Sequence, residues 1–308
     1  MENSTEITSF LLTAYGNIGS LKYLYFILML VWYFSIFVTN AFVITVIYLD
    51  RRLHEPMYIF LCNLFVSEIG GSTSLYPLLI SQMFSDTHEV TIPWCFLQMF
   101  LIYTCTSAEF YSLAAMAYDR YIAICYPLHY SVILTTDKAA VVILFIWLCS
   151  LTCCIIMFSL MVHVEYCGNA IDKVFCDYHL VVKLACSVSV INSISDLLYS
   201  CVSILLPVSF ISVSYLKILQ VCQKASQENK QKAITTCTPQ MVSVSNLFLG
   251  CIFHFADSRF DKTHVLDKVR IILSVYLLVF QPMISPFLYG FNLPKIRESC
   301  KRFLFSRK

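Results

Sequence analysis

Four ionisable side chains lie in or at the end of long apolar runs, where charged groups are rare. Asp119 and Arg120 follow directly after the apolar stretch 92–117, and Glu109 falls on the same helical stripe as Arg120, about 16 Å away at a rise of 1.5 Å per residue. Glu68 lies at a similar depth in the preceding apolar run. Charges at such positions are costly unless they are paired or face an interior, so these residues indicate ion pairing, ion binding or a switch.

Enzymatic chemistry would need further groups that the sequence does not arrange. Glu68 and Glu109 could be read as an acid/base pair, and His54, His129 and His254 as metal ligands, but the histidines are scattered without metal-ligand spacing. No nucleophile motif lies at membrane depth. The sequence therefore predicts that the protein is not an enzyme. A transporter or channel is the other rival, and the chain shows no internal repeat of the kind many transporters have.

Composition places the chain in a membrane. Of 308 residues, 58% are hydrophobic and 13% are charged, whereas soluble domains carry about 25% charged residues. A net charge of +2, with no glycine-rich phosphate loop and no basic run beyond the short tail, gives no indication of nucleic acid binding. The expected surroundings are membrane lipid rather than a polyanion.

Seven apolar runs are near or above the roughly 20 residues that cross a bilayer. They span residues 21–49, 57–80, 92–125, 139–162, 190–221, 239–256 and 268–291. The predicted fold is an all-α membrane protein, a bundle of seven transmembrane helices with a short amphipathic eighth helix. Most Lys and Arg residues lie in the segments that share a side with the carboxyl end, which favours an extracellular amino terminus and a cytoplasmic carboxyl terminus at the plasma membrane.

The expected organisation is an extracellular segment 1–21, a domain of seven transmembrane helices 22–293 and a cytoplasmic tail 294–308. The first segment is short and polar, without a signal-peptide pattern, and Asn3 opens an N-x-S/T sequon that predicts glycosylation if this end is outside. The tail mixes basic and apolar residues, as a helix lying on an anionic leaflet does. Cys300 in it is a weak candidate for palmitoylation.

Two carboxylates at one depth predict a small polar chamber. Glu68 and Glu109 would hold a sodium ion or share a proton there, with Ser285 of the last run supplying another oxygen. Protonated carboxyl groups with purely structural hydrogen bonds are the alternative, because burial favours the neutral form. No other cofactor is expected.

Most cysteines lie inside apolar runs, but four fall in or beside the outer loops, where disulfides persist. These four are Cys95, Cys167, Cys176 and Cys186. Four cysteines allow three pairings, and spacing does not choose among them.

Several motifs resemble those of one receptor family. The stretch 116–130 reads MAYDRYIAICYPLHY, residues 53–58 read LHEPMY, residues 232–237 read KAITTC and residues 282–289 read PMISPFLY. Together they resemble the odorant receptors, a branch of the rhodopsin-like class A G-protein-coupled receptors. Glu68, Gln240 and Ser285 depart from the family's usual aspartate, histidine and asparagine, which suggests a fish-type or otherwise divergent member.

The resemblance implies a function: an odorant binds in the outer half of the bundle and the receptor activates a stimulatory G protein, raising cyclic AMP. It implies the disulfide pairs Cys95–Cys176 and Cys167–Cys186. The residues implied for G-protein coupling and activation are Asp119, Arg120, Tyr121, Tyr215 and Tyr289. The expected ligand-binding residues are Ile102, Tyr103, Thr106, Ser107, Tyr199, Ser203, Phe253 and Tyr276. A non-olfactory receptor for another small molecule is the alternative, although Ile102 stands where amine receptors place an aspartate.

Overall fold

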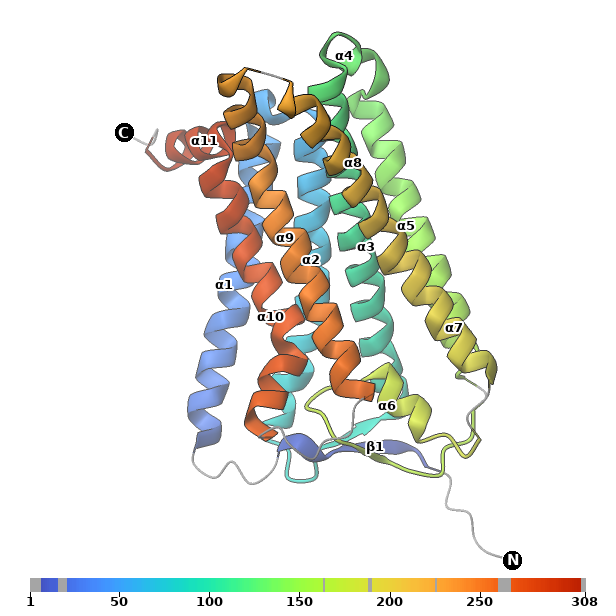
Figure 1. Ribbon diagram of the computed structural model, residues 1–308. Coiled ribbons are helices and arrows are strands. Elements are labelled where there is room, and N and C mark those ends of the chain that lie inside the picture. Colours follow the sequence, from blue (N-terminus) through green and yellow to red (C-terminus); the bar gives the residue numbers. More distant parts are fainter. Residues whose placement is uncertain are drawn as a thin grey trace, which may run out of the picture.

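The computed structural model describes residues 7–15, 21–162, 164–187, 190–224, 226–259 and 267–305. Long helices run side by side through it, and the predicted seven-helix membrane bundle is confirmed (Figure 1). They are α1 (Leu21–Leu49), α2 (Pro56–Gln82), α3 (Ile92–Cys125), α5 (Thr136–Ser159), α7 (Val190–Ser200) continued as α8 (Leu206–Gln223), α9 (Gln227–Arg259) and α10 (Asp267–Asn292). The Asn3 sequon lies outside the described residues.

The two ends of the bundle differ. A small sheet and the short helix α6 (Tyr178–Lys183) cover one end, called here the sheet end (Figure 1). At the other, the α11 end, lie α4 (Tyr130–Ile133) and α11 (Pro294–Phe305), which turns sideways from the bundle (Figure 1). The predicted amphipathic eighth helix is α11.

Helix α9 begins at Gln227, well before the predicted start at residue 239. Hydropathy marked only the apolar part of this helix, while its polar first turns contain good helix formers such as glutamine and lysine. Pro239 lies inside α9 and does not end it.

Three helical segments in the described residues are long and apolar enough to cross a membrane by composition alone: Lys22–Leu49, Thr136–Ser159 and Val190–Gln223. Only 17% of the most apolar window of the first is buried in the protein, and 28% in the other two. Helices α2 and α3 fall short because they bury polar and charged groups such as Asn63, Glu68 and Glu109 inside the bundle. A helix surrounded by protein does not need the apolar surface that lipid contact demands.

Helices α7 and α8 are joined by a π-helical turn, Cys201–Leu205. Pro207 follows in the first turn of α8 and lacks the N–H that would complete the regular ladder. The hydroxyl of Tyr111 on α3 donates to the carbonyl of Val202 within the turn at 2.8 Å. This bond satisfies a carbonyl group and fixes the turn against α3.

A three-stranded sheet closes the sheet end. The strand β1 (Ser9–Leu12) pairs antiparallel with β2 (Glu89–Thr91) and parallel with β3 (Ala170–Ile171), so β1 is central. Phe10 and Leu12 both face the interior, in alternation with Ser9 and Leu11, and are 0% and 1% exposed. The polar character of residues 1–21 did not predict this strand, whose alternation is only four residues long.

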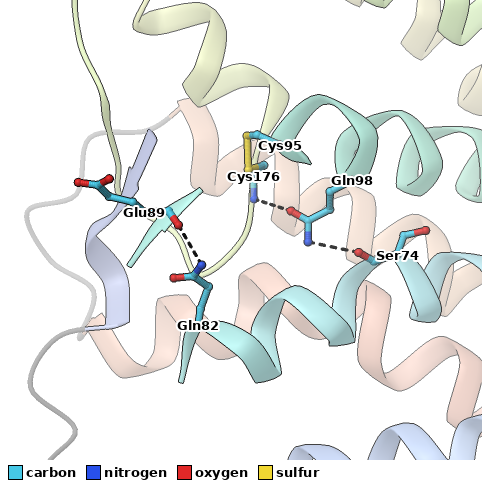
Figure 2. The surroundings of a disulfide bond; sticks show 6 residues. All are labelled: Ser74, Gln82, Glu89, Cys95, Gln98 and Cys176. Atoms are coloured by element: carbon cyan, nitrogen blue, oxygen red, sulfur yellow. Dashed lines mark hydrogen bonds between the residues drawn. A yellow bond between two sulfur atoms is a disulfide. The ribbon is translucent and has the colours of Figure 1, made fainter. Parts of the chain in front are cut away.

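The loop that carries β3 is held by the two disulfides that the resemblance implies, Cys95–Cys176 and Cys167–Cys186. Beside the first, the backbone N–H of Cys176 donates to Gln98 at 3.0 Å, and Gln98 donates to the carbonyl of Ser74 at 3.4 Å (Figure 2). The amide of Gln82 donates to the carbonyl of Glu89 in β2 at 3.1 Å (Figure 2). These contacts join the loop and sheet to α2 and α3.

Candidate functional site

At the α11 end, the charge of Arg120 is neutralised within α3. Its guanidinium lies 2.9 Å from the carboxylate of Asp119, whose side chain is fully buried. The hydroxyl of Tyr130 on α4 donates to the other oxygen of Asp119 at 2.7 Å, and the sulfur of Met57 contacts the guanidinium. Separating the partners of a buried ion pair is costly, because it leaves a buried charge uncompensated. A pair of this kind therefore defines two distinct states, intact and broken, as a switch requires.

A second set of contacts holds α9 against α3 and α8 near this pair. Tyr215 donates to the side-chain oxygen of Gln240 at 2.7 Å, and the Gln240 amide donates to the carbonyl of Leu113 at 2.5 Å. Gln240 is 2% exposed. Gln240 therefore connects three helices, α3, α8 and α9.

The remaining two predicted coupling residues lie on either side of this region. Tyr289 of α10 is buried and packs edge-on against Phe65. Tyr121 contacts Tyr126 and lies under the ammonium of Lys217, 5.4 Å from its ring centre.

Toward the sheet end lies a cavity of about 80 Å³. Four of the predicted ligand-binding residues line it: Ile102, Tyr103, Thr106 and Tyr199. Tyr199 donates to the backbone carbonyl of Tyr103 at 2.7 Å, which joins α7 to α3 across one wall. Lining residues that sequence reasoning did not name as ligand-binding are His179, Asp196, Ser200, Ile204, Cys251, His254 and Leu278.

The other four predicted ligand-binding residues face elsewhere. Ser107 accepts a hydrogen bond from Ser150 of α5 at 3.1 Å, because it lies about 100° around α3 from Thr106. Ser203 is buried within the π-helical turn, which changes the phase of the helix. Tyr276 donates to Asn246 at 2.5 Å, and Phe253, 40% exposed, lies edge-on to it.

Charged groups form a network between α6, α7 and α9 at the cavity. His179 lies 3.4 Å from Asp196, and His254 lies 3.3 Å from Asp177. Lys173 contacts Asp177 at 2.7 Å, with both side chains almost fully buried. Burial alone raises the pKa of the Asp177 carboxyl, but the Lys173 ammonium and the two histidines lower this pKa below its usual value. The network holds the loop segment and α6 in one position over the cavity.

Asp177 was not among the site residues predicted from the sequence. It is buried, and its side chain also caps α6 by accepting a hydrogen bond from the N–H of Leu180 at 3.1 Å. The feature of the sequence that could have indicated this burial is the position of Asp177 directly after Cys176, because residues beside a disulfide that joins a loop to the bundle lie close to the bundle.

The predicted carboxylates lie together in mid-bundle. Glu68 and Glu109 line a space of about 10 Å³ together with Ser72 and Thr106, and Thr106 also lines the larger cavity. Neither oxygen of Glu68 lies in good hydrogen-bond geometry with a neighbour in the described part of the chain, although the side chain is fully buried and Ser285 and Gln281 lie close to it. Such a group is costly without a proton or a counter-ion. The space is about the size of one water molecule and fits a single small cation.

The third predicted ion-site residue, Ser285, is also buried and accepts a hydrogen bond from Gln281 at 3.1 Å. Gln281 donates to Ser243 of α9 as well, at 2.6 Å. Ser285 therefore takes part in a polar connection between α10 and α9.

A bundle of seven membrane helices, with a cavity toward one end of α3 and a neutralised Asp–Arg pair at the other, has the architecture of the rhodopsin fold. The solved structure of squid rhodopsin matches with a TM-score of 0.72 at 18% identity, covering 92% of this chain and 85% of that chain. The fold is therefore that of a G-protein-coupled receptor.

A family model for the olfactory receptors matches residues 28–307. Olfactory receptor 6N1 of Homo sapiens is 32% identical over 302 residues, covering 97% of this chain and 96% of that protein. Olfactory receptor 4E2 of Mus musculus is 31% identical over 302 residues, again covering 97% and 96%. The chain belongs to the olfactory receptor family, whose members are receptors and not enzymes. A fish-type origin stays a prediction.

Proposed function

We propose that the protein is an odorant receptor of the plasma membrane that activates a stimulatory G protein and so raises cyclic AMP. One observation carries the proposal: the same helix, α3, lines the cavity with Thr106 and carries the neutralised Arg120. A ligand that shifts α3 or its neighbours therefore acts on the helix that holds the coupling residue. In this orientation the sheet end is extracellular and the α11 end is cytoplasmic, in agreement with the distribution of basic residues.

The cavity favours a small, mostly apolar ligand with one hydrogen-bonding group. Its volume of about 80 Å³ equals that of only a few water molecules, so a larger ligand needs some movement of side chains. Ile102, Ile204 and Leu278 provide apolar walls. Because His179 and Asp196 already pair with each other, an uncharged head group such as a hydroxyl or carbonyl fits better than an amine or an acid.

The mechanism is a shift between two states. In the resting state Asp119 neutralises Arg120, and Gln240 holds α9 against Tyr215 and the Leu113 carbonyl. A ligand that binds more tightly to the state in which α9 is displaced outward increases the population of that state. In that state Arg120 is released toward the G protein. Tyr215 of α8 and Tyr289 of α10 resemble the tyrosines that stabilise the open state in this receptor class.

Between cavity and coupling site, Glu68 and Glu109 hold either a sodium ion or a shared proton. A bound sodium ion would supply the positive charge that the buried Glu68 carboxylate lacks among its described neighbours, Ser285 and Gln281 being uncharged. Thr106 lines both the cavity and this chamber, so a ligand that contacts Thr106 also contacts a wall of the chamber. Glycosylation at Asn3 and palmitoylation at Cys300 remain predictions of the sequence.

The experiment is a screen of uncharged, amine and acid odorants on cells that express the full chain, with cyclic AMP as the readout and a matched line lacking stimulatory G protein. With an active odorant, Thr106→Val should raise the half-maximal concentration about tenfold, from loss of one hydrogen-bonding group in the cavity. Ser107→Ala is the matched control, because this neighbouring hydroxyl faces α5. Arg120→Ala should abolish the response at normal surface expression.

Three results would contradict the proposal. They are an equal shift in the Thr106 and Ser107 variants, a full response from Arg120→Ala, and a ligand-evoked response that persists without the G protein.

A further inference from the structure

An apolar groove opens where α11 meets α1 and α10. Its volume is about 490 Å³, and its walls include Phe42 of α1, Phe287 and Phe291 of α10 and Leu304 of α11. Phe287 and Phe291 are stacked, with ring centres 6.1 Å apart, and they are 41% and 66% exposed. Apolar surface at this place on a membrane protein is covered by lipid chains.

Gly290 keeps the middle of the groove open. A side-chain carbon built at this position would meet no other heavy atom within 4 Å. The glycine comes directly before Phe291 in α10 and itself lines the groove. A larger residue at position 290 would therefore fill the groove without displacing its neighbours.

The basic residues of α11 divide into two faces. Lys295 pairs with Glu55 at 2.6 Å and Arg302 pairs with Asp50 at 2.9 Å, so this face attaches α11 to the α1–α2 connection. The hydroxyl of Ser299 also donates to Asp50 at 2.6 Å.

Arg297 and Lys301 belong to the other face. They are one helical turn apart, both are exposed, and both line the apolar groove. Neither forms a side-chain ion pair or hydrogen bond within the described residues, in contrast to Lys295 and Arg302. The groove therefore combines an apolar wall with two exposed cations that can contact an anion.

We propose that this groove binds an anionic glycerophospholipid, with its head group on Arg297 and Lys301 and one acyl chain along Phe287, Phe291 and Leu304. The long stems of arginine and lysine cover apolar surface while their charged ends reach the head-group layer. The cytoplasmic leaflet is rich in anionic lipid, so the site depends on the cytoplasmic placement of α11 proposed above. It depends on neither odorant nor G protein.

The test uses the full chain in phosphatidylcholine nanodiscs that contain a few per cent of phosphatidylserine with a photoreactive diazirine on one acyl chain. Hydroxylamine first removes any thioester-linked chain from Cys300, which also lines the groove. After illumination, the adduct is quantified by intact mass and located by peptide mapping. The expected adduct lies on α10 and α11 around the groove and exceeds that from the matching phosphatidylcholine probe.

Two variants act on different parts of the site. The double variant Arg297→Gln, Lys301→Gln removes the head-group contacts and should lower phosphatidylserine labelling about tenfold or more. Gly290→Leu fills the apolar part and should lower labelling without any change of charge. The control Arg51→Gln, Lys224→Gln removes two charges from the same end of the protein but away from the groove, and should leave labelling unchanged.

Several outcomes would overturn the site. Equal labelling by phosphatidylcholine would show unspecific contact with surrounding lipid, and an equal effect of the control double variant would show diffuse attraction by the whole face. Full competition by soluble glycerophosphoserine, which lacks acyl chains, would show that the groove is not used. Because no step needs signalling, failure here leaves the proposed receptor function untouched, and failure of the odorant screen leaves this site untouched.

Discussion

Replacing Gln240 by leucine removes the side chain that holds α9 in its resting position, while keeping a similar volume. Two hydrogen bonds are lost, one from Tyr215 at 2.7 Å and one to the carbonyl of Leu113 at 2.5 Å. Each contributes about 1 kcal/mol net, so the resting state loses about 2 kcal/mol relative to a state in which α9 has moved away. That difference changes the ratio of active to resting receptor roughly 30-fold.

If the active fraction is on the order of 1% before the change, it becomes about a quarter afterwards. The assay is ligand-independent cyclic AMP, normalised to receptor at the cell surface. Ligand sensitivity provides a second readout, because a receptor that is already partly active needs less ligand to reach half-maximal response. We therefore expect basal signalling to rise and the half-maximal concentration to fall together. A variant that merely folds poorly would lose surface expression and maximal response instead.

The matched control is Met241→Leu, at the adjacent position of α9, where the side chain is 43% exposed and leucine removes no hydrogen bond. Its basal signalling should remain that of the native receptor. Unchanged basal signalling in Gln240→Leu at normal surface expression would refute the role of Gln240 as a resting-state contact. A rise of equal size in Met241→Leu would refute it as well, since any change in this part of α9 would then be sufficient.

Three further predictions concern the rest of the molecule. The Cys95–Cys176 disulfide joins residues separated by 81 positions, and its loss should cost about 4.5 kcal/mol in the chain-entropy account. The Cys167–Cys186 disulfide has a separation of 19, and its loss should cost about 3 kcal/mol. Cys95→Ser should therefore reduce surface delivery, measured by quantitative flow cytometry, more than Cys186→Ser. Replacing external and internal sodium by N-methylglucamine should alter basal signalling of the native receptor but not of Glu109→Gln; equal responses would favour a shared proton. Lys173→Met should lower the free energy of unfolding at pH 7 by about 3 kcal/mol, and with it the unfolding temperature, since it leaves Asp177 buried without its main partner. Because folding lowers the pKa of Asp177 in the native protein, its carboxylate stabilises the fold above the unfolded pKa of about 3.9, and this stabilisation is lost only below that pH. The variant instead gains stability as the pH falls, because protonation removes the unpaired charge of Asp177. The difference between the two unfolding temperatures should therefore shrink from pH 7 to pH 4.

The helices were predictable because the bilayer fixes the length of an apolar segment. The bounds of α1 and α3 agree with the runs 21–49 and 92–125, and both begin and end where polar residues or proline interrupt the pattern. The depth of Glu68 and Glu109 followed from helical rise alone, and the structure places both at one chamber. The disulfide partners needed the family resemblance, since spacing allowed three pairings.

The details that decide which residues contact the ligand were harder to predict from the sequence. Thr106 and Ser107 are adjacent, yet one lines the cavity and the other contacts α5, a distinction set by the rotation of α3 against its neighbours. Ser203 was assigned by regular helical spacing, which the π-helical turn before Pro207 interrupts. His179 and His254 come from a loop helix and from α9, and only the folded loop brings their rings within 6.2 Å of each other.

The division between apolar and polar helices also indicates where function lies in this bundle. The segments that satisfy a membrane-span criterion by composition, α1, α5 and α7 with α8, bury little of their surface in protein and mainly face lipid. Helices α2 and α3 miss that criterion because they carry the carboxylates, the Asp–Arg pair and the amides that connect one helix to the next. Their polar groups are stable in a membrane only because other helices surround them, so the outer helices are a physical requirement for the inner chemistry. A substitution that adds a charge to the lipid-facing side of α5 should therefore damage insertion, whereas the same charge beside Glu109 should alter signalling first.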